Sequence, residues 1–214
     1  MSAYSCDKCG KDFKQKSQYE RHCARKTPCI QQEPSKEAAN TVVAEHLEVV
    51  DTPTPTPRST IKPLVKWSGG KTDELKKIIP YLPESYHTYL EPFIGGGAVY
   101  FHVNPERAVI SDVHKELIDL YQAVKNGHSA DIYEFMQQNP NEEETYYKVR
   151  ASAHIDQLDS AKRFYYLRKT CFRGMLRYNS KGQFNIPYGR YKTYNYTDLQ
   201  NTQYEDLLKR TDVL

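Results

Sequence analysis

The sequence predicts an α/β domain with a mostly parallel sheet, placed behind a small cysteine-rich module. Three observations predict it. Four of the five cysteines lie in the first 29 residues, alternating proline follows near residue 55, and from residue 61 short strands alternate with amphipathic helices through glycine turns. The 214 residues suit one full domain with small attachments and are too few for two large domains.

Two classes of protein are excluded by composition. No stretch approaches the roughly 18 consecutive apolar residues of a membrane helix, so no membrane partner is expected. The start, Met1 to Ser5, carries no apolar run of a secretory signal. We therefore expect an intracellular protein whose cysteines are reduced and available as metal ligands.

The first module, residues 1–31, has the spacing of a metal site. Two residues separate Cys6 from Cys9, and twelve residues separate Cys9 from His22. This resembles a C2H2-type zinc finger, a ββα fold in which Phe13 and Tyr19 would form the small core. Metal binding would supply the folding energy, since so short a piece buries little surface. A reduced, unstructured tail is the alternative.

The fourth ligand departs from that family's pattern, in which it follows the histidine by three to five residues. Cys23 is adjacent to His22 and would point off its helix face. Cys29 lies seven positions on, after Pro28, and returns to that face, as in a variant finger from proteins of large DNA viruses. The expected zinc ligands are therefore Cys6, Cys9, His22 and Cys29. DNA contact and protein contact remain open for this module.

Residues 32–60 read as a linker. They carry a net charge of −3, against +4 for residues 1–31, and end in Thr52-Pro53-Thr54-Pro55-Thr56-Pro57. Alternating proline supports neither a helix nor an inner strand, which predicts an extended spacer.

The elements of the third segment, 61–214, follow in order. An amphipathic stretch runs from Thr72 to Ile79, and strands are expected at His87–Phe93 and Arg107–Ser111. Apolar residues at helical spacing predict a helix over Lys115–Asn126, stopped by Gly127. One long or two short helices are expected over Glu142–Leu167.

Two glycine turns punctuate this segment. Ser68-Gly69-Gly70-Lys71-Thr72 is only a partial P-loop, because Val65 stands where the first glycine is required, so nucleotide hydrolysis is excluded. Gly95-Gly96-Gly97 follows the first strand, and Asp112 ends the second, where a carboxylate can accept ribose hydroxyls. A tight turn without a ligand is the alternative at the glycines.

Three motifs in order carry a resemblance to a known family: Lys66 to Lys71, Glu91 to Gly97 with Asp112, and Arg177 to Lys192. Together they are similar to Dam-type (D12 class) adenine-N6 DNA methyltransferases. The resemblance implies a Rossmann-like sheet, incomplete at the C-terminus, and S-adenosyl-L-methionine as cofactor. The implied cofactor contacts are Trp67, Lys71, Phe93, Gly95, Gly97 and Asp112.

A basic, aromatic window supports duplex DNA as partner. Residues 160–197 contain nine Lys/Arg, ten Phe/Tyr and no acid. A hairpin is expected around Asn179 to Gly182, and Tyr178 could fill space beside a displaced base. The alternative is a solvated basic face over buried tyrosines. The candidate cations for phosphates or guanine edges are Arg173, Arg177, Lys181, Arg190 and Lys192.

The family builds its target-base pocket from the tetrapeptide [D/N]-P-P-[Y/F/W], which the sequence lacks. Asn185-Ile186-Pro187-Tyr188 is a near miss inside the hairpin. We therefore expect no catalytic residue here, and the resemblance implies part of a DNA adenine methyltransferase. The alternatives are one half of a split enzyme with a second chain, or a non-catalytic zinc-finger DNA-binding protein. The viral likeness implies the host nucleus or a viral factory as location.

Overall fold

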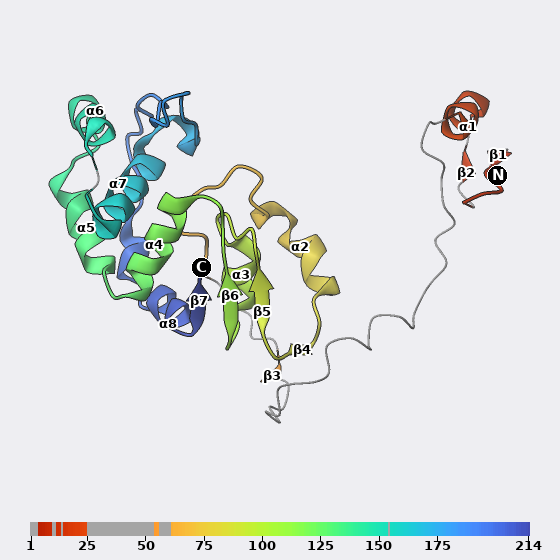
Figure 1. Cartoon of the computed structure of the whole chain (residues 1–214), viewed down its shortest axis with the longest axis horizontal. Helices are drawn as coiled ribbons and strands as arrows, with labels where there is room; N and C mark the ends of the chain where they lie inside the picture. Colours follow the sequence, from red (N-terminus) through yellow and green to blue (C-terminus); the bar gives the residue numbers. More distant parts are fainter. Residues whose placement is uncertain (1–3, 10–11, 14, 25–53, 56–60, 154) are drawn as a thin grey trace. The chain divides into compact units, whose positions relative to one another are not determined.

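The computed structural model describes residues 4–9, 12–13, 15–24, 54–55, 61–153 and 155–214. The chain divides into two compact units, Met1–Val50 and Asp51–Leu214, each of which is described by itself (Figure 1). Within the described ranges, no helix has the length and apolar character needed to cross a membrane.

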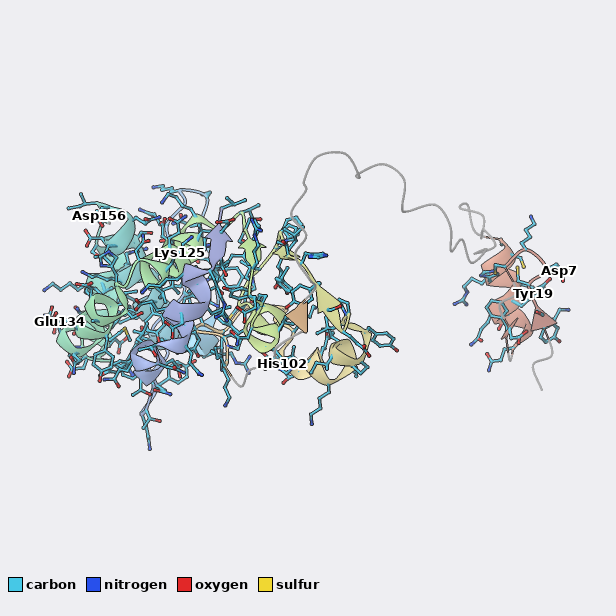
Figure 2. The ribbon with its side chains drawn as sticks, turned by 90° about the horizontal axis from the view of Figure 1, so that it is seen from below. Asp7, Tyr19, His102, Lys125, Glu134 and Asp156 are labelled. Atoms are coloured by element: carbon cyan, nitrogen blue, oxygen red, sulfur yellow. The ribbon has the colours of Figure 1, made fainter. Side chains whose placement is uncertain are left out.

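The first unit consists of a hairpin followed by a helix. Strands β1 (Tyr4–Ser5) and β2 (Asp12–Phe13) pair antiparallel, and α1 spans Lys16–Cys23. The ring of Tyr19, labelled in Figure 2, stacks on Tyr4 at 6.0 Å and meets Phe13 edge-on at 6.1 Å. The ββα order expected from the sequence is observed, with the two predicted aromatic residues in contact.

The second unit opens with a small antiparallel pair and a broken helix. Strand β3 (Thr54–Pro55) pairs with β4 (Ser85–Tyr86). The predicted helix Thr72–Ile79 consists of a 3₁₀ turn (Thr72–Glu74), one α-helical turn, α2 (Leu75–Ile78), and a second 3₁₀ turn (Ile79–Tyr81). Pro80 lacks the amide that would continue the α-helical pattern, which accounts for the early end of α2.

The centre of the unit is a sheet whose strands run parallel, as predicted, and it includes a third strand that the sequence did not predict. Its order is β5 (Tyr89–Glu91), β6 (Ala108–Ile110) and β7 (Thr211–Val213), with Leu90 opposite Val109 and Val109 opposite Asp212. The strand β5 is shorter than the predicted His87–Phe93. Because the strands are parallel, their carboxyl ends lie at one edge, where the glycine turn and Asp112 follow.

The described part of this unit also contains the α-helices α3 (Ala98–Val103), α4 (Lys115–Lys125), α5 (Ser129–Gln138), α6 (Glu143–Ala151), α7 (Gln157–Thr170) and α8 (Gln203–Lys209), and short 3₁₀ helices at Phe172–Gly174 and Thr197–Gln200. The predicted stretch Glu142–Leu167 is two helices, because Asp156 caps α7 by accepting a hydrogen bond from the amide of Asp159 at 2.8 Å. Helix α4 packs on α7 and α8 (Figure 1). Lys125, labelled in Figure 2, ties α4 to β7 through the Thr211 carbonyl at 2.6 Å.

The core of this unit is rich in tyrosine. The rings of Tyr100, Tyr121 and Tyr146 are fully buried, and each hydroxyl has a partner: Thr211 at 2.7 Å, the Gly95 carbonyl at 2.8 Å and the Ile186 carbonyl at 2.7 Å. Buried hydroxyls need such partners because an unpaired one is costly. The bond from Tyr121 fixes the glycine turn on the α4 core.

Candidate functional site

The glycine turn after β5 requires glycine at two positions. Gly95 and Gly97 have φ of +51° and +71°, conformations that side chains with a Cβ rarely adopt. The turn is closed by the Gly97 amide, which donates to the Ile94 carbonyl at 2.8 Å. Helix α3 begins at the next residue, so the turn presents backbone, without side chains, at the sheet's edge.

Asp112 lies at the tip of β6 and is tied to that turn. Its Oδ2 accepts a hydrogen bond from the Gly95 amide at 2.9 Å, and its Oδ1 accepts one from the His114 amide at 3.0 Å. The side chain is half-buried. Each oxygen keeps further lone pairs, so the carboxylate can still accept hydroxyl protons from a ligand.

The indole of Trp67 lies directly over the glycine turn. A Cβ built on Gly95 would stand 2.6 Å from Trp67 Cδ1, and one on Gly96 would stand 3.1 Å from Trp67 Cβ. His114 meets the indole edge-on at 5.5 Å. Burial lowers the pKa of this imidazole, which packs on Phe164 and Tyr178 as well. Trp67, Gly95 and Asp112, predicted from distant parts of the sequence, therefore lie together.

Two other implied cofactor contacts are exposed to solvent. Phe93 is 77% exposed, and Lys71 is exposed with its Nζ 3.7 Å from a carboxylate oxygen of Glu74. Val113, which was not among the residues predicted for the site, is 89% exposed directly after Asp112. Its signal was available, since an apolar residue follows the strand-end acid. Phe93 and Val113 thus offer apolar surface beside the carboxylate.

A cavity of about 540 Å³ adjoins Trp67, a size typical of small-molecule sites. It is built from the segment that leads into the first 3₁₀ turn, the start of that turn, the glycine turn with the first residue of α3, and the residues after α7. Three cations and one acid line it: Lys62, Lys66, Arg173 and Asp73.

Arg168 of α7 is a buried cation that the sequence analysis did not single out. It is 3% exposed, its guanidinium lies 5.5 Å from the Trp67 ring, and it donates to the Lys66 carbonyl. Among the described residues its Nε and Nη1 have no hydrogen-bond partner. Burial lowers the pKa of this guanidinium. The signal in the sequence was its i, i+4 spacing from the buried Phe164.

The predicted hairpin is present after α7. The chain reverses where the Gly182 amide donates to the Asn179 carbonyl at 2.9 Å, and Tyr178 bridges antiparallel to Phe184. Gly182 has φ +71°, and Asn179 Oδ1 accepts from the Lys181 and Gln183 amides. These are the turn properties for which Asn and Gly are selected.

All five predicted DNA cations are exposed. Four of them lie on or beside this hairpin: Arg177, Lys181, Arg190 and Lys192. Arg177 donates to Asn185 at 2.8 Å, and Arg190 is 3.5 Å from a carboxylate oxygen of Glu143. The fifth, Arg173, lines the cavity beside Trp67.

A buried carboxylate anchors the hairpin to the sheet's helices. Glu116 on the first turn of α4 accepts a hydrogen bond from Arg163 of α7 at 2.9 Å and one from the hydroxyl of Tyr178. The side chains of Arg163 and Glu116 are 10% and 13% exposed. Tyr178 also packs edge-on against Phe184 at 5.7 Å. Tyr178 is thus fixed from two sides.

The first unit brings three predicted metal ligands together. One ligand atom from each of Cys6, Cys9 and His22 lies within 4.8 Å of the others, and His22 Nε2 is 3.4 Å from Cys9 Sγ. Cys23 is exposed and is not part of this group, as expected. The predicted fourth ligand, Cys29, lies outside the described residues.

A parallel sheet with a glycine turn, a strand-end acid and an aromatic wall is an arrangement typical of α/β proteins that bind nucleosides. Comparison with protein families identifies which one: residues 67–213 match the D12 class N6 adenine-specific DNA methyltransferases. The chain belongs to this family.

Known relatives agree with this membership. The chain is 56% identical to the type II methyltransferase M.CviBI of Paramecium bursaria Chlorella virus NC1A over 156 residues, 72% of this chain and 60% of that protein. It is 40% identical to M1.LlaDCHI of Lactococcus lactis subsp. cremoris over 140 residues (62% and 49%). It is 35% identical to the DNA adenine methylase of Haemophilus influenzae over 151 residues (66% and 52%). The chain thus spans about half to three fifths of these relatives' length.

Proposed function

We propose that this chain supplies the cofactor-binding and DNA-recognition parts of an adenine-N6 methylation of duplex DNA, with S-adenosyl-L-methionine as methyl donor. The observation that carries the proposal is the joint placement of Trp67, Gly95 and Asp112 at the carboxyl ends of two adjacent parallel strands. Family membership supports the same reaction class.

The residues present fit a sulfonium nucleoside. Any side chain at Gly95 would strike Trp67, so the turn keeps bare backbone at the ligand's edge. Asp112 can accept the two ribose hydroxyls, and the exposed faces of Phe93 and Val113 can cover the adenine. When bound, this cofactor supplies a methyl group on a positively charged sulfur.

The hairpin and its cations form the proposed duplex-facing surface. Arg177, Lys181, Arg190 and Lys192 are exposed and can neutralise phosphates or reach base edges. Tyr178 stands at the hairpin's base, where its ring could pack beside a displaced adenine. The pairing of its hydroxyl with Glu116 fixes the ring's starting position.

Methyl transfer also needs a pocket for the displaced base, which the family builds from a [D/N]-P-P-[Y/F/W] tetrapeptide. The second candidate is that the chain binds cofactor and DNA and transfers a methyl group only with a partner that carries this motif. Incubation with labelled cofactor and an adenine-containing duplex separates the two. Transfer by the pure chain would refute the second candidate.

The cofactor proposal is tested by the change Asp112→Ala. Losing a charged acceptor should weaken binding of S-adenosylhomocysteine by about 1–3 kcal/mol, measured by titration calorimetry on the full chain. Asp131→Ala, an exposed carboxylate on α5 paired with His128, is the matched control and should leave the affinity unchanged. Equal affinity for Asp112→Ala and the unchanged protein would remove Asp112 from the site.

For the first unit we propose a zinc site formed by Cys6, Cys9, His22 and Cys29. The buried position of Cys6 and His22 and the close approach of three ligand atoms support it. Two thiolates and an imidazole match the donor set that zinc prefers. A nuclear or viral-factory location is proposed with it, since the relative M.CviBI comes from a virus.

A further inference from the structure

Arg173 has a backbone conformation that its side chain disfavours. Its φ and ψ are 56° and 13°, in the left-handed region, and it sits between the end of α7 and the hairpin. The next residue, Gly174, has φ +59°. A residue with a Cβ in this region costs about 1 kcal/mol or more, and such residues concentrate at functional sites. Glycine would adopt this conformation without strain, but the residue at this position is arginine.

This conformation places Arg173 in the wall of the cavity beside Trp67. A Cβ built on Gly174 would lie 3.5 Å from Lys66, so the turn packs against the segment that carries Trp67. Within the described part of the chain, Arg173 makes no salt bridge with a carboxylate. Its guanidinium lies 5.8 Å from the Phe172 ring and is an exposed cation in the wall of a cavity that is partly open to solvent.

The electrostatics of the cavity suit a small zwitterion. Its walls hold the cations Lys62, Lys66 and Arg173 and one acid, Asp73. Arg168, buried behind Trp67 without a carboxylate partner among the described residues, adds to the positive potential. An α-amino acid presents one carboxylate and one ammonium, which match this arrangement of charges.

We propose that Arg173 binds the carboxylate of the amino-acid end of the nucleoside cofactor, with Asp73 facing its ammonium. This rests on the proposed function, because it is the same ligand, and it assigns Arg173 to the cofactor instead of the DNA phosphates. The nucleoside end would stay with Asp112, so the ligand extends from Asp112 past Trp67 into the cavity.

The test compares two probes that differ only at the end in question. S-adenosylhomocysteine carries the amino acid, and 5′-methylthioadenosine lacks it. Calorimetry on the full chain should show that Arg173→Gly weakens the binding of S-adenosylhomocysteine about tenfold or more. The affinity for 5′-methylthioadenosine should be unchanged. This variant should fold, because glycine relieves the strain at φ 56°. Its thermal midpoint should therefore not fall.

Arg190→Gly is a matched control. Arg190 also has positive φ (54°), but it is 76% exposed beside the hairpin and does not line the cavity. This change should leave the affinity for S-adenosylhomocysteine unchanged and weaken binding of a 20-base-pair duplex. Arg173→Gly should show the reverse pattern.

Three results would overturn the assignment. Arg173→Gly could weaken the binding of both nucleosides equally, or it could change the binding of neither. It could also weaken binding of the duplex while the affinity for the cofactor is kept, as expected of a phosphate contact. Failure of the proposed function looks different, because the unchanged protein would then bind neither nucleoside.

Discussion

At the scale of the residue, the site depends on contacts so close that no side chain fits at Gly95. The clearest is the approach of Trp67 to Gly95, where backbone and indole are in direct contact. Asp112 and Tyr121 then fix the same glycine from its amide and its carbonyl. Three side chains from separate segments thus converge on one residue without a Cβ.

Gly95→Ala should therefore destabilise the second unit by about 2–4 kcal/mol, since the new Cβ adds a steric clash to an unfavourable φ. Urea unfolding followed by tryptophan fluorescence measures this, because Trp67 is the chain's one tryptophan. Gly69→Ala is the control: its φ is +75°, but nothing lies within 4 Å of the added Cβ, so about 1–2 kcal/mol is expected. Equal losses in the two variants would mean that Trp67 yields freely.

Residue-level prediction from the sequence succeeded where backbone geometry dictates the outcome. Parallel strands end at one edge, so Gly95 and Asp112 could be brought together from their positions after two strands. The burial of Arg168 could not be predicted, because this residue lies in a window of nine cations whose composition is typical of a solvated face. The left-handed backbone of Arg173 could not be predicted either, because this conformation carries no signal in the sequence.

At the scale of the element, α4 links the sheet edge to the hairpin. His114 caps its first turn by accepting from the Leu117 amide, while Glu116, two residues later, holds Arg163 and Tyr178. The amphipathic pattern of Lys115–Asn126 predicted this helix well. Helix α5 was missed although Ile132 and Met136, both buried, have helical spacing.

Glu116→Ala should cost about 3–5 kcal/mol in urea unfolding, because it leaves the buried Arg163 guanidinium without its carboxylate. Tyr178→Phe should cost about 1 kcal/mol, the usual net value of one hydrogen bond.

The double variant tests whether the two residues act together. In the Glu116→Ala background, Tyr178→Phe should be neutral or slightly stabilising, since the hydroxyl has already lost its acceptor. An identical cost in both backgrounds would show that Glu116 and Tyr178 have no interaction energy with each other.

At the scale of the whole molecule, the chain is two units with separate sources of stability. Asp51–Leu214 has a core of buried aliphatic and aromatic side chains. The described part of the first unit buries Cys6 and His22, and its folding energy is proposed to come from metal. The sequence divided the chain at residues 31 and 60, but Thr54–Pro55, expected in the linker, pairs with Ser85–Tyr86.

Cys9→Ser should abolish stoichiometric zinc binding and unfold the first unit, while the thermal midpoint of the second unit stays within about a degree. Zinc release to a colorimetric chelator and a thermal scan by circular dichroism measure the two effects. Cys23→Ser is the control, because Cys23 lies outside the ligand group and should keep the metal. A shift in the main transition would mean that the units are energetically coupled.

The hydrogen bond from the Gly95 amide to Asp112 has a consequence for affinity. Because the polypeptide itself fixes one carboxylate oxygen, this side chain has lost its rotational freedom before any nucleoside arrives. The entropy of immobilising this side chain is therefore lost when the protein folds, and it does not weaken association with the ligand. A site assembled in this way is preorganised, so it should bind at a rate set by diffusion and ligand orientation, with no slow rearrangement of the acid.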